Sequence, residues 1–121
     1  MTFYESGEHL GKGDLGLLST IEKGELKRWV RTNNKFTEKK CNVITFEKLL
    51  TQTGVDKIDF ISIDAEGLDY DILTQIDLTK LGVSMVIVET NSKEDEKYIR
   101  YCHSHGLALK HKNYENLILA K

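Results

Sequence analysis

The sequence contains no proline and only two cysteines among its 121 residues. Cys41 and Cys102 lie far apart, without the spacing of a metal site or a disulfide framework, and two free thiols suit a reducing compartment. Positive charge is not in excess, since 17 basic residues face 19 acidic ones, which argues against nucleic acid as a partner. No apolar run approaches the roughly 20 residues that span a bilayer, and the N-terminus lacks the pattern of a signal peptide. We therefore expect a cytoplasmic protein that binds neither nucleic acid nor membrane.

From Asn42 onward, strand-like and helix-like segments alternate. Strands are predicted at NVITF, at IDFISID (58–64) and at VSMVIVE (83–89), and the nearly continuous apolar run of the last is typical of a strand covered on both faces. Helices are predicted between these strands at FEKLLTQ and over 68–76. A third helix, after the last strand, is predicted to end at Gly106. LALKH and ENLILA then form a predicted hairpin around Asn113. This order indicates an α/β fold whose sheet is mostly parallel and closes on a C-terminal antiparallel hairpin.

Polar residues and glycines mark the expected helix ends. Thr45 is placed to cap the first helix, and Gly54 to end it in the left-handed conformation. Ser92 and Asp95 have the spacing of a capping box before the last helix. In the first forty residues, TFY fits a short strand and LKRWV fits a helix.

The stretch GKGDLG (11–16) matches the G-x-G-x-x-G pattern of dinucleotide-binding loops. In that motif an apolar strand ends just before the first glycine and a helix opens at the last one. Here the polar residues ESGEHL precede Gly11 instead. We therefore interpret GKGDLG as a surface loop rather than a cofactor loop.

Acidic and polar side chains follow two neighbouring predicted strands. Asp64 and Glu66 stand in SIDAEG, at the end of one strand and directly before a helix, while Glu89 and Asn91 end the next strand. Ligands of open α/β sheets bind at this carboxyl edge. Carboxylates placed there can accept a proton, orient a hydroxyl group or hold a hard cation such as Mg²⁺.

A purely structural interpretation of SIDAEG fits the pattern equally well. Asp64 or Glu66 can cap the free N–H groups of the following helix or interact with its positive dipole end. Gly67 can be present only because the turn is tight. Spacing alone does not decide between function and capping.

Several stretches together resemble a known family. VDKIDFISIDAEGLDYDIL is similar to the central signature of FkbM-type methyltransferases, in which an apolar strand leads into Asp–x–Glu–Gly and a helix. TFEKLL (45–50) resembles the segment before that signature, VIVETN (86–91) resembles the strand after it, and YENLILAK resembles the closing strand. The resemblance covers residues 42–121, with vaguer similarity in FYES and LLST upstream.

The resemblance implies a Rossmann-like methyltransferase that uses S-adenosylmethionine and methylates an oxygen of a sugar or another small metabolite. It implies a catalytic set of Asp64, Glu66 and Glu89, with Glu66 as substrate ligand or base and Asp64 orienting the reactants. Asp64 and Gly67 are the expected cofactor-binding residues, and no resident metal is expected. A Mg²⁺-assisted, catechol-type transfer, with Asp64, Glu89 and Asn91 as ligands, is an alternative.

The family's glycine-rich cofactor loop and the acidic strand end that binds the ribose have no counterpart in the sequence. We therefore expect residues 1–41 to be a loop-rich segment of the same domain and 42–121 to be the C-terminal part of the methyltransferase-like domain, with the N-terminal cofactor-loop half missing. Such a sheet has an open edge that invites a second copy or a complementing chain. The alternative function is a non-catalytic α/β remnant or half-domain that acts by pairing with another chain.

Overall fold

The computed structural model describes residues 1–7, 19–29 and 35–121. GKGDLG lies outside the described residues. The chain forms two compact units. Unit 1 comprises Met1–Val43 with Ala65–Leu68, and unit 2 comprises Ile44–Asp64 with Asp69–Lys121.

Unit 1 contains a two-stranded antiparallel sheet of β1 (Thr2–Ser6) and β2 (Phe36–Lys40). Tyr4 extends the pairing, because its N–H donates to Thr20 O at 2.7 Å and its carbonyl accepts from Thr20 N at 3.0 Å. A 3₁₀ helix, η1 (Glu25–Trp29), follows. The predicted strand at TFY and the helical character of LKRWV are thus confirmed as far as Trp29.

The strand predicted at NVITF is wrong, because residues 41–45 form neither helix nor strand. Val43 and Ile44 are 52% and 47% exposed. Thr45 instead adopts the extended N-cap conformation, and its side chain accepts from Lys48 N at 3.2 Å. A β-branched run needs a neighbouring strand to become a strand itself, and this one leads directly into a helix.

That helix, α1 (Phe46–Thr53), is confirmed together with both of its caps. Gly54 ends it at φ 69°, in the left-handed region that favours glycine, and donates its N–H to Leu50 O at 2.8 Å. No residue of α1 is buried. Its attachment to the rest of unit 2 includes a hydrogen bond from Phe46 N to the Gln75 side chain at 3.3 Å.

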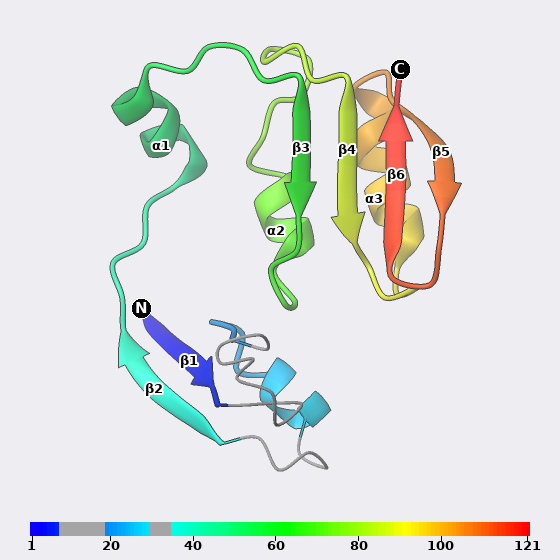
Figure 1. Ribbon diagram of the computed structural model, residues 1–121. Coiled ribbons are helices and arrows are strands. Elements are labelled where there is room, and N and C mark those ends of the chain that lie inside the picture. The colour runs from blue at the N-terminus through cyan, green and yellow to red at the C-terminus, as the bar shows by residue number, and fades with distance from the viewer. Residues whose placement is uncertain (8–18, 30–34) are drawn as a thin grey trace. The chain divides into compact units, whose positions relative to one another are not determined.

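Unit 2 is built on a four-stranded sheet in the order β3-β4-β6-β5 (Figure 1). Its strands are β3 (Phe60–Ile63), β4 (Met85–Glu89), β5 (Ala108–Lys112) and β6 (Asn116–Ala120). Pairing is parallel between β3 and β4, whereas β6 runs antiparallel to both β4 and β5. The α/β class and the closing hairpin are confirmed. The expectation of a mostly parallel sheet is wrong, because β6 inserts between β4 and β5 and makes both of its pairings antiparallel.

Helices α2 (Asp69–Leu73) and α3 (Asp95–Ser104) lie against the same face of this sheet (Figure 1). The core between sheet and helices includes fully or nearly fully buried Val86, Val88, Leu117, Leu119, Leu73 and Cys102. Met85 on the opposite face of β4 is 38% exposed. The prediction that β4 is covered on both faces is therefore wrong, since burial alternates along the strand.

Both helices differ from the sequence prediction at their ends. α2 ends at Leu73, earlier than predicted. Ile76 lies in the turns that follow the helix and is buried there. The capping box is wrong: Glu94 precedes α3 in a left-handed conformation (φ 52°) without a side-chain cap. The Ser92 hydroxyl donates instead to Tyr114 O, a partner 22 residues away. Within the described ranges, none of the helices combines the length and apolar character of a bilayer span.

Candidate active site at the strand ends

Two carboxylates lie side by side at the carboxyl edge of the unit 2 sheet. Ile63 and Val88 are register partners in the parallel pair β3–β4. The residues that follow them are Asp64, which is exposed, and Glu89, which is partly exposed. Glu89 alternates with buried Val88 along β4, so it belongs to the sheet face opposite α2 and α3. The sequence prediction that these strand ends meet is confirmed.

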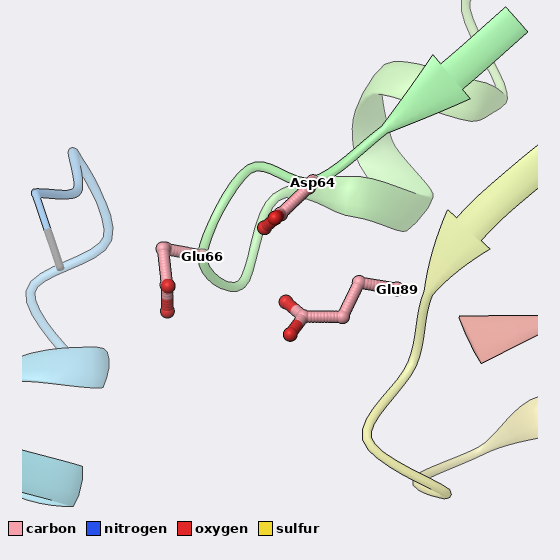
Figure 2. Close-up of side chains that lie close together, drawn as sticks. All are labelled: Asp64, Glu66 and Glu89. Carbon is pink, nitrogen blue, oxygen red and sulfur yellow. The ribbon is translucent and has the colours of Figure 1, made fainter. Parts of the chain in front are cut away.

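Glu66 follows Asp64 through a single residue. One carboxylate oxygen of Asp64 lies within 4.8 Å of one carboxylate oxygen of Glu89, and Figure 2 shows both side chains. Two carboxylates of this kind suit a hard cation or a positively charged organic group. Asp64 and Glu89 belong to unit 2, whereas Glu66 belongs to unit 1.

Glu66 is held within unit 1 through both its backbone and its side chain. Its carbonyl accepts from the Thr20 hydroxyl at 2.8 Å, and its Oε2 lies 3.7 Å from Arg28 Nη1. The Glu66 side chain is 17% exposed. Its backbone adopts φ 46°, an uncommon conformation for a residue other than glycine. The prediction from sequence contained no partner for Glu66, because Arg28 is remote in sequence and stands in no recognisable motif.

Gly67 has a structural reason to be glycine. Its φ is +100°, and a Cβ added there would lie 2.7 Å from the Glu25 Cγ atom. A side chain at this position is therefore excluded by backbone conformation and by crowding from within unit 1. The cofactor-binding role of Gly67 stays a prediction.

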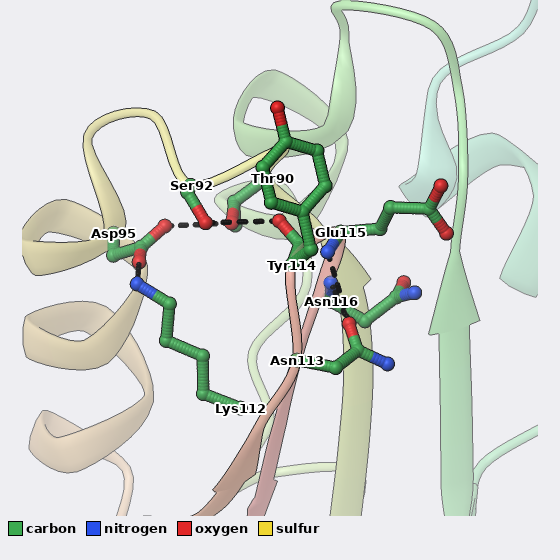
Figure 3. Close-up of polar contacts among 8 residues, drawn as sticks. All are labelled: Thr90, Ser92, Asp95, Lys112, Asn113, Tyr114, Glu115 and Asn116. Atoms are coloured by element: carbon green, nitrogen blue, oxygen red, sulfur yellow. Dashed lines mark hydrogen bonds and ion pairs between the residues drawn. The ribbon is translucent and has the colours of Figure 1, made fainter.

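The loop after β4 is tied to the turn between β5 and β6 (Figure 3). Buried Thr90 donates its hydroxyl proton to Asp95 Oδ1 at 2.6 Å, and Asp95 Oδ2 forms an ion pair with Lys112. The backbone N–H groups of Thr90 and Asn91 both donate to Glu115 O, at 2.7 and 2.9 Å. These contacts fix the backbone directly after Glu89. The sequence analysis missed Lys112, because this residue has no local signature.

The carboxyl of Asp95 has a lowered pKa, because Lys112 and then Thr90 donate hydrogen bonds to its charged form, and their effect exceeds that of burial. A folded pKa below the unfolded value of about 4 stabilises the fold above that unfolded value. This stabilisation is lost as the pH falls through the folded pKa. We expect the wild-type chain to be more stable than Asp95→Asn near neutral pH, and the difference to shrink below about pH 4. Urea unfolding followed by circular dichroism across this pH range measures it.

The exposed Glu96→Gln, one residue further along α3, is the matched control for the loss of one negative charge. A difference between wild type and Asp95→Asn that stays constant from neutral to acidic pH would show that the ion pair contributes through packing alone.

The sequence of the chain matches one known protein family. The family model for the methyltransferase FkbM domain matches residues 2–115. No curated protein and no solved structure matches the chain.

In open α/β sheets, ligands bind at the carboxyl ends of the strands, which is the edge where Asp64 and Glu89 lie. The family match spans nearly the whole sequence and begins well before Asn42, where the sequence resemblance starts. The chain belongs to the FkbM methyltransferase family.

Proposed function

We propose that this domain is an S-adenosylmethionine-dependent methyltransferase that acts on an oxygen of a sugar or another small metabolite. The observation that carries the proposal is the pair Asp64 and Glu89, at the ends of the parallel strands β3 and β4 in a member of a methyltransferase family. The substrate class comes from the family resemblance. The roles of the individual residues are our own assignment.

The residues at this edge fit the charge of the cofactor. S-adenosylmethionine carries a sulfonium and an ammonium group, and Asp64 and Glu89 place two carboxylates beside each other. Opposite charges a few ångströms apart attract strongly near a protein surface. Asp64 is the residue that we expect to hold or orient the cofactor, and Glu89 lines the same edge.

When bound, S-adenosylmethionine supplies a methyl group that is already activated by the positive sulfur. The chain then has to align an acceptor hydroxyl with that methyl and remove its proton. The carboxylate of Glu66 would take the proton of that hydroxyl group, the role that the family resemblance implies for it. Arg28, 3.7 Å from Glu66 Oε2, offers the counter-charge that keeps this carboxylate in place.

Calorimetric titration of S-adenosylmethionine and S-adenosylhomocysteine into the purified chain tests the proposal. We expect micromolar binding, weakened by about tenfold to a hundredfold in Asp64→Asn, because a charge-assisted contact of about 1.5–3 kcal/mol is lost. Asp59→Asn is the matched control: Asp59 immediately precedes the same strand, at its opposite end, and its side chain is 75% exposed. Equal affinities for wild type and Asp64→Asn would remove Asp64 from the site.

A second candidate function is pairing with another chain at the outer edge of β3. This strand has a neighbour on one side only among the described strands, and Phe60 is 51% exposed on it. Unpaired edge strands readily accept a further strand. No heat at high ligand concentration, together with a sedimentation mass above 13.9 kDa, would favour this function over methyl transfer.

A further inference from the structure

The turn between β5 and β6 carries an exposed aromatic ring. Tyr114 is 79% exposed, more than any other large hydrophobic residue that the structure describes. Single exposed aromatic residues are common on protein surfaces and mean little by themselves. Two further features indicate a binding role for Tyr114: the backbone that carries its ring, and its position at the edge of the sheet.

The backbone of the turn is held by a dense set of hydrogen bonds. Asn113 Oδ1 accepts from Glu115 N at 3.0 Å and from Asn116 N at 2.7 Å. The Tyr114 carbonyl accepts from the Ser92 hydroxyl at 2.9 Å (Figure 3). A ring on a fixed backbone loses little further freedom when it binds a ligand, because only its side-chain torsions remain to be ordered.

The loop to which the turn is attached is strained. Asn91, Ser92 and Glu94 all have positive φ angles, of 51°, 55° and 52°. This conformation is unfavourable for residues other than glycine, and it persists only where surrounding contacts hold it. Backbone strain of this kind gathers at ligand-binding and catalytic sites.

Tyr114 also lies at the edge of the sheet that carries the carboxylates. Glu89 is the register partner of Asn116 in the β4–β6 pair, and Tyr114 precedes Asn116 by two residues. All these residues belong to unit 2. An exposed tyrosine on a fixed backbone therefore lies two residues from the register partner of Glu89, at the strand end where we place the reaction.

We propose that Tyr114 binds the acceptor by packing the face of its ring against a ring of the acceptor, next to the hydroxyl group that is methylated. This inference rests on the proposed methyl transfer. The face of a tyrosine ring is electron-rich and attracts the polarised C–H groups of a sugar or the edge of an aromatic ring. Both kinds of acceptor present several such groups on one rigid ring, whereas an acyclic alcohol has no ring to place against the tyrosine. Tyr114 thus selects ring-bearing acceptors over acyclic ones.

Three variants test the inference: Tyr114→Ala, Tyr114→Phe, which keeps the ring, and Leu109→Ala. Leu109 is a matched control, because it is 40% exposed in the same hairpin but lies near the start of β5, at the end away from the turn. The probes are methyl α-glucoside, catechol and glycerol, each titrated by saturation-transfer NMR in the presence of S-adenosylhomocysteine and then assayed as methyl acceptors.

We expect Tyr114→Ala to weaken binding of a ring compound, and to raise its KM, by about threefold to tenfold. The value of kcat, the affinity for the cofactor and the response to glycerol should stay unchanged. Tyr114→Phe should restore the binding, and Leu109→Ala should behave as wild type. Preference for catechol over the glucoside, or the reverse, identifies which ring the site takes.

Failure of this inference can be told from failure of the proposed function. Equal binding of ring compounds by wild type and Tyr114→Ala, or no binding of either ring compound by wild type, overturns the role of Tyr114 whatever the cofactor titration gives. Ring binding that depends on Tyr114 in a chain that neither binds the cofactor nor transfers a methyl group supports the stacking role and overturns the methyltransferase proposal.

Discussion

Replacing Glu66 by Gln is expected to lower kcat for methyl transfer by about a hundredfold to ten-thousandfold, the usual contribution of a positioned general base. The amide keeps the size and shape of the side chain but cannot take the acceptor's proton. The backbone of Glu66 is held independently by Thr20, whose hydroxyl donates to its carbonyl, so the loop should keep its course. Transfer of a labelled methyl group to the best acceptor, with calorimetric affinity for S-adenosylmethionine measured in parallel, provides the readout.

Glu25→Gln separates proton transfer from the pairing with Arg28. Arg28 Nη1 lies 3.2 Å from Glu25 Oε2 and 3.7 Å from Glu66 Oε2, so each variant removes one of its two carboxylate partners. We expect Glu25→Gln to change kcat by less than about threefold, the scale of an exposed ion pair. If the two variants lose equal activity, Glu66 acts by positioning Arg28 and is not the base.

The second large effect concerns Leu117 on β6, an interior strand of the sheet. Leu117 is fully buried on β6, where it is the register partner of Val88 on one side and of Lys112 on the other. Leu117→Ala is expected to lower the free energy of unfolding by about 2–5 kcal/mol through lost burial and the cavity left behind. That is a large share of the about 5–15 kcal/mol that holds a domain together.

Urea unfolding followed by circular dichroism measures this loss, with Leu109→Ala as the matched truncation of a leucine that is 40% exposed on β5. The control should cost less than about 1 kcal/mol, because little apolar surface is exchanged with water. Equal losses in the two variants would contradict the tightly packed centre of the sheet. Leu117→Met, which conserves volume, should cost less than about 1.5 kcal/mol.

Features that depend on neighbouring residues were predictable from the sequence. Thr45 and Gly54 cap α1 as their residue types predict, and the hairpin turn forms around Asn113. The meeting of Asp64 and Glu89 follows from two successive apolar strands, each ending in an acid. In each case the deciding interaction lies within a few residues or follows from the parallel pairing rule.

Features set by partners distant in sequence were not predictable. The sequence places β6 next to β5 but does not show that it also pairs with β4, which turns the sheet from mostly parallel to mixed. The Ser92 hydroxyl had a plausible local role as a helix cap and found a carbonyl 22 residues away instead. Arg28 reaches Glu66 across a similarly long stretch of sequence. A single sequence does not show which of several possible strand, hydrogen-bond or ion-pair partners a residue takes in the fold.

The position of β6 also governs the order in which the sheet can form during synthesis. β3 and β4 are made first and can pair with each other at once, but β5 has no partner among the described strands except β6. Until residues 116–120 leave the ribosome, β5 stays unpaired, and the edge of β4 that later pairs with β6 stays open. A nascent chain in this state exposes the surface that chaperones bind. Pausing or release before residue 116 should therefore yield a protein that is captured or degraded rather than one that folds.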